Sequence, residues 1–200
     1  MSPFAQLLAT DGVIEECELR SSFGLMAFHG GGLEEMTDVI AREVAEQANA
    51  SYYAVLQPAE LRRHIPSHRI DPAVSPSLTS FLSHVEVVIT LHGYGRHGLW
   101  QSLLLGGRNR ELADHVATHL RDVLPEYEIR HDLDEIPADL RGQHPSNPVN
   151  LPKCQGVQIE LPPRVRGASP IWDNWAGPGH TPHTQALIDG LSSAALTWTI

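Results

Sequence analysis

The sequence is poor in cysteine and has no long apolar run. Its two cysteines, Cys17 and Cys154, stand far apart without C-x-x-C spacing, so we expect free thiols in a reducing compartment. No stretch reaches the roughly 18 consecutive apolar residues that a membrane span needs. The first 20 residues lack the basic start and apolar core of a secretory signal. We therefore expect a cytoplasmic protein without a membrane partner.

Lysine is almost absent as well. Lys153 is the one lysine, so arginine supplies nearly all of the 14 basic residues, which face 24 acidic ones, and the formal net charge is −10. This acidic balance argues against a general nucleic-acid binder. Because 42% of the 200 residues are hydrophobic, the chain can bury a proper core. We expect a single domain over residues 1–200.

Hydrophobic periodicity predicts strands that alternate with helices. The predicted strands are 13–19, 23–28, 51–56, 86–91, 99–105, 127–131 and 156–161. The predicted helices are 37–49, 76–85, 109–124 and 181–196. The first two strands look like a pair, and Thr37 and Thr181 are placed to cap the helices that they begin. This alternation predicts an α/β fold with a mixed, mostly parallel sheet flanked by helices.

The stretch FHGGGLEE, residues 28–35, places three glycines between a histidine and two glutamates. Glycines allow a sharp turn or a close approach of the backbone, so the turn can bring His29 and a following carboxylate to one point. His92 and Glu160 stand at or near the ends of two other predicted strands, and Arg108 follows a fourth. If these strands are parallel, their side chains meet at one edge of the sheet.

Two histidines and a glutamate are one standard ligand set of catalytic zinc. His29, His92 and one of the two glutamates would supply that set, with Glu160 as the general base for a zinc-bound water. Each residue also has a plainer interpretation. A histidine at a strand end is often a hydrogen-bonding loop residue, and Glu160 could form a salt bridge within its strand.

Other chemistries have less support in the sequence. A lipase would need a G-x-S-x-G motif and a nucleotide-binding P-loop would need Gly-Lys-Ser/Thr, and the sequence contains neither. His115 and His119 have the i, i+4 spacing of a helical metal pair but lack an accompanying acid. We expect them to be surface residues.

Five segments together resemble the poly-gamma-glutamate hydrolase family of phage-type and bacterial zinc enzymes. They are FHGGGLEEMT, HIPSHRIDP, ITLHGYG, LLLGGRN and GVQIELPPRVR, in that order between about residues 13 and 166. The resemblance implies a carboxypeptidase-like α/β core. It also implies that His29, Glu34 and His92 hold zinc, and it selects Glu34 over Glu35.

The same resemblance assigns the other site residues. It makes Glu160 the catalytic carboxylate and places Arg108 and Arg166 against substrate carboxylates, with Asn150 nearby. His68 is a further polar residue expected near the site. The resemblance predicts an arginine where this chain has Leu151, which leaves the substrate preference open.

The leading hypothesis is a zinc-dependent amide hydrolase that acts on an anionic, poly-gamma-glutamate-like substrate. The first alternative is a zinc amidase or deacylase for cell-wall peptides or another small amide. The second is a non-catalytic binding domain that kept the fold, which the intact ligand and base set argues against.

Overall fold

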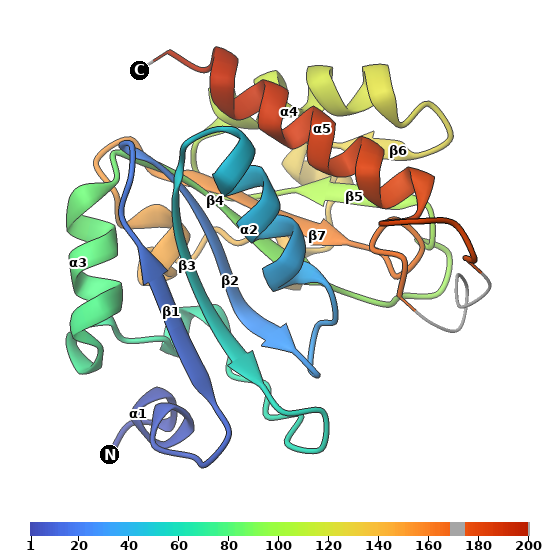
Figure 1. Ribbon diagram of the computed structural model, residues 1–200. Coiled ribbons are helices and arrows are strands. Elements are labelled where there is room, and N and C mark those ends of the chain that lie inside the picture. The colour runs from blue at the N-terminus through green and yellow to red at the C-terminus, as the bar shows by residue number, and fades with distance from the viewer. Residues whose placement is uncertain (169–174, 200) are drawn as a thin grey trace.

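The computed structural model describes residues 1–168 and 175–199. Figure 1 shows a central sheet with helices on both faces. The strands are β1 (Ile14–Glu18), β2 (Phe23–Gly31), β3 (Ser51–Gln57), β4 (Val87–Gly93), β5 (Ser102–Leu105), β6 (Glu128–Arg130) and β7 (Gly156–Leu161). The helices are α1 (Pro3–Leu8), α2 (Thr37–Gln47), α3 (Pro76–His84), α4 (Arg110–Val123) and α5 (Pro182–Thr197). This architecture confirms the predicted α/β class.

Strand direction determines which side chains share an edge of the sheet. The strand order is β1-β3-β2-β4-β7-β5-β6. The pairs β2–β3, β2–β4, β4–β7 and β5–β6 are parallel, whereas β1–β3 and β5–β7 are antiparallel. The sheet is therefore mixed and mostly parallel, as predicted. The carboxyl ends of β2, β3, β4 and β7 lie at one edge, and those of β5 and β6 lie at the opposite edge.

The predicted pairing of the first two strands is wrong. β3 lies between β1 and β2 and pairs with both of them. β1 carries Glu15, Glu16 and Glu18, which suit an edge strand. β2 and β3 are buried along nearly their whole length, as strands in the centre of a sheet should be.

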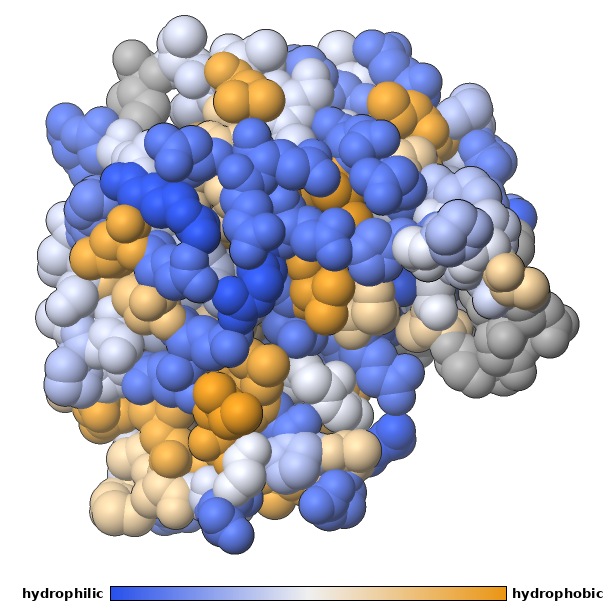
Figure 2. Space-filling model, in the orientation of Figure 1, coloured by the Kyte–Doolittle hydropathy of each residue, from blue (hydrophilic) through white to orange (hydrophobic). Residues whose placement is uncertain are grey.

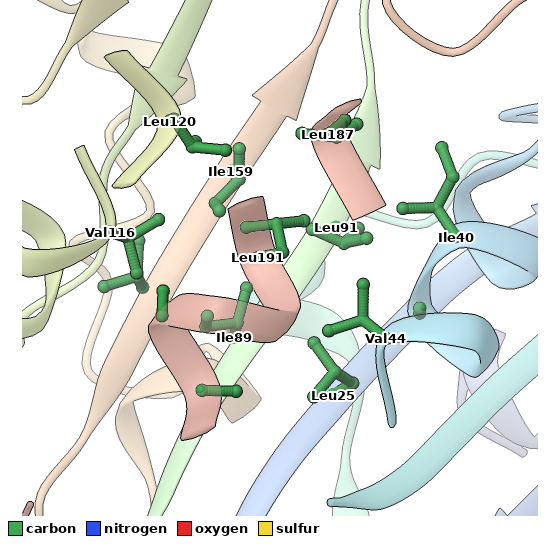
Figure 3. Close-up of a cluster of buried hydrophobic side chains, with 14 of the residues drawn as sticks. Leu25, Ile40, Val44, Ile89, Leu91, Val116, Leu120, Ile159, Leu187 and Leu191 are labelled. Atoms are coloured by element: carbon green, nitrogen blue, oxygen red, sulfur yellow. The ribbon is translucent and has the colours of Figure 1, made fainter. Parts of the chain in front are cut away.

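Each face of the sheet has its own layer of apolar packing. Leu25, Ile89 and Leu91 face α2, α4 and α5, which contribute Ile40, Val44, Val116, Leu120, Leu187 and Leu191 (Figure 3). On the other face, Met26, Phe28 and Val88 pack with residues of α1 and α3. Successive residues of β2 and β4 alternate between these layers, which explains the nearly continuous apolar run predicted for β4.

The helix starts are only partly as predicted. Thr181 caps α5, because its hydroxyl accepts a hydrogen bond from the Thr184 N–H at 3.2 Å. Thr37 is not the cap of α2. Met36 holds that position with a φ of 74°, and the Thr37 hydroxyl donates to the Glu34 carbonyl oxygen at 2.8 Å. Thr37 therefore fastens the loop before α2 to the helix.

The face shown in Figure 2 is mainly hydrophilic, with small apolar groups over its upper part and a larger apolar group toward the lower left. This pattern is usual for a solvent-exposed face covered by amphipathic helices. Within the described ranges, each helix is too short or too polar to cross a membrane.

Two valines of α4 test this packing. Val116 is fully buried between α4 and the sheet, whereas Val123, which the helical stripe places on the same face, is 37% exposed at the last residue of α4. Val116→Ala should lower the free energy of unfolding by about 2 kcal/mol, since it removes two buried methyl groups and leaves a cavity. Val123→Ala should cost less than about 1 kcal/mol. Urea unfolding of both variants measures the difference, and equal losses would contradict the packing.

Candidate functional site

The three glycines at the end of β2 lead into a turn that brings Glu34 back to His29. The Glu34 N–H donates to the His29 carbonyl oxygen at 2.8 Å, which closes the turn. Gly31 has a φ of +67°, a backbone conformation that other residues rarely adopt. The turn therefore places the side chains of residues 29 and 34 together, with Oε1 of Glu34 at 2.8 Å from Nδ1 of His29.

The Glu34 carboxylate also contacts the end of β4. Its Oε2 lies 3.3 Å from Nδ1 of His92 and accepts a hydrogen bond from the Gly93 N–H at 2.9 Å. A side chain at position 93 would not fit, because its Cβ would lie 3.0 Å from Cβ of Glu34 and 2.8 Å from Cζ of Arg166. One buried carboxylate thus lies between two imidazoles from different strands, while the neighbouring Glu35 is exposed.

The hydrogen bonds of His29 restrict what can lie between its ring and Glu34. Nε2 of His29 lies 2.9 Å from the carbonyl oxygen of Ile65, which only accepts, so Nε2 carries the proton. In a neutral imidazole, Nδ1 then holds a lone pair that faces Glu34. This lone pair and those of the Glu34 carboxylate oxygen repel each other unless a proton or a metal ion lies between the two atoms. Imidazole nitrogens and a carboxylate form a suitable donor set for a metal ion.

The pKa values agree with an ionised Glu34. Burial alone would raise the pKa of Glu34, but His29 and His92 outweigh this effect and hold it well below its usual range. Burial would lower the pKa of His92, and the Glu34 carboxylate reverses that shift and raises it. The charge of Glu34 is therefore kept at neutral pH, as a metal ligand requires.

Glu160 stands next to this group on the neighbouring strand. β4 and β7 are parallel, and His92 is in register with Glu160. The Glu160 side chain is 5% exposed, and burial, partly offset by His92, raises its pKa to about 7. A carboxyl group with such a pKa can both take up and release a proton near neutral pH.

A chain of two amides orients Glu160. Oδ1 of Asn147 accepts from the Val149 N–H at 3.4 Å, so Nδ2 of Asn147 faces Gln158 and donates to its Oε1 at 2.8 Å. Nε2 of Gln158 is thereby turned toward Glu160 and donates to its Oε1 at 2.8 Å. The backbone thus sets the direction of both amides, and one oxygen of Glu160 is already engaged.

A cavity of about 880 Å³ opens over these residues. Its walls come from the loop after β3, the end of β4 and the long loop before β7. The lining residues are Glu34, His64, Pro66, Ser67, His68, His92, Gly93, Tyr94, Ala138, Asp139, Leu140, Gly142, Gln143, His144, Asn147, Gln158 and Glu160. The predicted position of His68 near the site thus agrees with the structure.

Arg108 does not line this cavity. β5 is antiparallel to β7, so the residue after β5 lies near the start of β7, at the edge opposite His92. The Arg108 side chain is exposed, and its Nε donates to the Gln143 carbonyl oxygen at 3.2 Å. The expectation that it shares an edge with His92 is wrong, because that expectation assumed a parallel β5. The contact of Arg108 with substrate stays a prediction. It would require a substrate that extends beyond the cavity.

Asn150 supports the loop instead of lining the cavity. Its Nδ2 donates to the carbonyl oxygens of Gly142 and His144 at 2.7 and 3.0 Å, and its Oδ1 accepts from the Arg108 N–H at 3.0 Å. These bonds use both amide hydrogens. Asn150 therefore fixes the cavity wall, and its predicted role in substrate binding stays a prediction.

Arg166 lies beneath the site. It is 6% exposed, and its guanidinium donates to the carbonyl oxygens of Leu161 and Glu35. Burial lowers the pKa of Arg166, an effect that Glu34 and Glu35 partly offset. The arginine thus holds the turn of Glu34 against the end of β7, and its contact with a substrate carboxylate stays a prediction.

Sequence reasoning missed His64. Among the described residues, one set of three metal-binding side chains has ligand atoms within 4.8 Å of one another, and it consists of His29, Glu34 and His64. The ring centroids of His29 and His64 lie 4.7 Å apart, and those of His29 and His92 lie 5.1 Å apart. The available signal was that His64 follows β3. Two further histidines, His115 and His119, lie away from the cavity against Thr197.

Comparison with known proteins identifies the family. The family model for poly-gamma-glutamate hydrolase matches residues 4–176. The chain therefore belongs to the poly-gamma-glutamate hydrolase family, which confirms the resemblance seen in its motifs. A curated relative, the SPbeta prophage-derived UPF0714 protein YoqZ of Bacillus subtilis (strain 168), is 32% identical over 99 residues. The match covers 49% of this chain and about a third (34%) of that relative's length.

Solved structures show the same fold. A bacteriophage poly-gamma-glutamate hydrolase superposes with a TM-score of 0.75 at 22% identity, covering 92% of this chain and 89% of the other. YNDL in its zinc-free apo form superposes with a TM-score of 0.73 at 22% identity, covering 91% and 88%. At these identities the likeness supports the fold alone.

The raised pKa of Glu160 predicts how the stability of the metal-free protein depends on pH. Its ordinary value is 4.5 and its folded value about 7, so between these pH values the folded state keeps a proton that the unfolded state releases. The free energy of unfolding should therefore fall by about 3 kcal/mol as the pH rises through this window.

Glu160→Gln is the control for this effect. Urea unfolding in the presence of a chelator should show a much smaller fall for the variant between pH 4.5 and 7. Glu34 acts in another window, since its lowered pKa removes stability only as the pH falls below 4.5. The same pH dependence in both proteins would show that Glu160 does not titrate as described.

Proposed function

We propose that this protein is a zinc-dependent amide hydrolase that cleaves a carboxylate-rich, gamma-glutamyl-type substrate. The observation that carries the proposal is the buried Glu34 carboxylate between the Nδ1 atoms of His29 and His92, with Glu160 in register beside His92. Membership of a hydrolase family supports the reaction class. The donor types favour zinc.

In this proposal His29, Glu34 and His92 hold the ion. When bound, zinc lowers the pKa of a water molecule to about 7 and polarises the scissile carbonyl group. The backbone carbonyl of Ile65 fixes the ring of His29 by accepting from its Nε2, and the Gly93 N–H fixes Glu34. These contacts set the ligands before substrate arrives.

Glu160 is the general base. It accepts a proton from the attacking water as the oxygen bonds to the carbonyl carbon, and it passes that proton to the amine nitrogen as the C–N bond breaks. Because Gln158 donates to Oε1, Oε2 is the oxygen available for the proton. Gln158 and Asn147 act through Glu160 as positioning residues.

One observation favours a second candidate, a zinc amidase for a less anionic amide. The described residues that line the cavity include three acids, Glu34, Asp139 and Glu160, and neither lysine nor arginine. A substrate panel decides between the two. Gamma-linked glutamate oligomers should be cleaved faster than their amidated forms if the leading proposal holds, and slower if the second one does.

The ligand set makes the first functional prediction. His29→Ala and His92→Ala should each lose the roughly one zinc ion per chain that the intact protein retains after dialysis, because a three-ligand site does not tolerate the loss of an imidazole. His64→Ala should keep it. Elemental analysis measures the zinc content. If His64→Ala loses the ion and His92→Ala keeps it, then His64 is the third ligand.

The base makes the second functional prediction. Glu160→Gln should keep both zinc and fold while kcat falls by roughly 10² to 10⁴, the usual contribution of a general acid–base. Glu35→Gln is the matched control, because Glu35 is exposed and does not line the cavity. It should change neither zinc content nor kcat. An unchanged kcat for Glu160→Gln would assign that residue a structural role.

A further inference from the structure

A second hollow adjoins the catalytic cavity. It has a volume of about 390 Å³, and His68 lines both spaces. On the facing wall, His144 lines the cavity and the next two residues line the second hollow. The rings of His68 and His144 have centroids 4.8 Å apart. This histidine pair therefore marks the boundary between the two spaces.

The second hollow is lined by an arginine, Arg69, whereas, among the residues described, neither lysine nor arginine lines the catalytic cavity. Its lining residues are His68, Arg69, Ile70, Asp71, Pro72, Pro145, Ser146 and Leu151. Over the part of the chain that the structure describes, the Arg69 guanidinium is exposed and forms neither a hydrogen bond nor an ion pair. Asp71, the acid in the hollow, accepts from the Ala73 N–H at 3.0 Å. Arg69 is therefore available to an anionic ligand.

Both walls of this hollow are fixed by hydrogen bonds. On one side, the Arg69 N–H donates to the Pro66 carbonyl oxygen at 2.8 Å, and Ile70 is buried beneath the loop. On the other side, the His144 carbonyl oxygen accepts from Asn150 at 3.0 Å. The position of Arg69 relative to the cavity is thus set by the fold. A guanidinium can bind a carboxylate through two parallel hydrogen bonds.

We propose that the second hollow is a substrate subsite in which Arg69 binds a carboxylate of a gamma-glutamyl-type chain that passes the His68–His144 pair. The inference rests on the proposed function for the identity of the chain. This subsite explains how a cavity without lysine or arginine accepts a carboxylate-rich substrate, because the guanidinium of Arg69 lies in the adjoining hollow. Leu151 provides the apolar wall against which the methylene groups of such a chain can pack.

The test measures binding separately from cleavage. In a zinc-loaded Glu160→Gln background, calorimetry gives the Kd of a gamma-linked glutamate pentamer and of the dimer. Adding Arg69→Gln should weaken pentamer binding about 10- to 100-fold, the usual range for a hydrogen bond to a charged group. Dimer binding should change less than about twofold, because the dimer fits within the cavity.

Arg62→Gln is the matched control. Arg62 is an exposed arginine of the same loop that lines neither space, so its removal changes the net charge equally and should leave both Kd values unchanged. Equal effects of the two substitutions, or equal effects on pentamer and dimer, would overturn the subsite. Hydrolysis of the dimer by the unsubstituted protein tests the proposed function independently of either result.

Discussion

The contact on which the site depends is that of the Glu34 carboxylate with two imidazoles. A buried carboxylate without partners would lose its charge, yet here each oxygen faces a ring nitrogen and one also accepts a backbone N–H. Because Nε2 of His29 is committed to a carbonyl oxygen, its Nδ1 can face the Glu34 carboxylate only across a proton or a metal ion. The turn after β2, the end of β4 and the start of α2 are all positioned around this one carboxylate.

The sheet places Glu160, the proposed base, relative to Glu34 and its two imidazoles. Neighbouring strands lie about 4.8 Å apart, and the parallel register of β4 and β7 sets His92 beside Glu160. The amides of Gln158 and Asn147 then give Glu160 a fixed orientation. His92 and Glu160 are thus held by backbone pairing, whereas most of the cavity wall comes from loops.

Much of this arrangement could be predicted from the sequence. Apolar runs indicated the strands, and the polar residues at the ends of three parallel strands indicated His29, His92 and Glu160. The chemistry of the residues left Glu34 and Glu35 equivalent, and only the family resemblance separated them. Arg108 was misplaced because local sequence does not encode whether a strand runs parallel or antiparallel to its neighbour. His64 was missed because a histidine within an irregular loop has no periodic pattern to mark its direction.

The reversal of β5 has a consequence for how the protein can change over evolutionary time. Because β5 runs opposite to β7, the connection that follows β5 leaves from the far edge of the sheet. The long segment that precedes β7 instead contacts Gln158 of that strand and lines the cavity. This segment bears none of the three proposed ligands and is anchored by Asn147 and Asn150. Insertions or exchanges ahead of these anchors, among the cavity-lining residues between 138 and 144, can reshape the wall of the cavity, while His92 and Glu160 keep their separation.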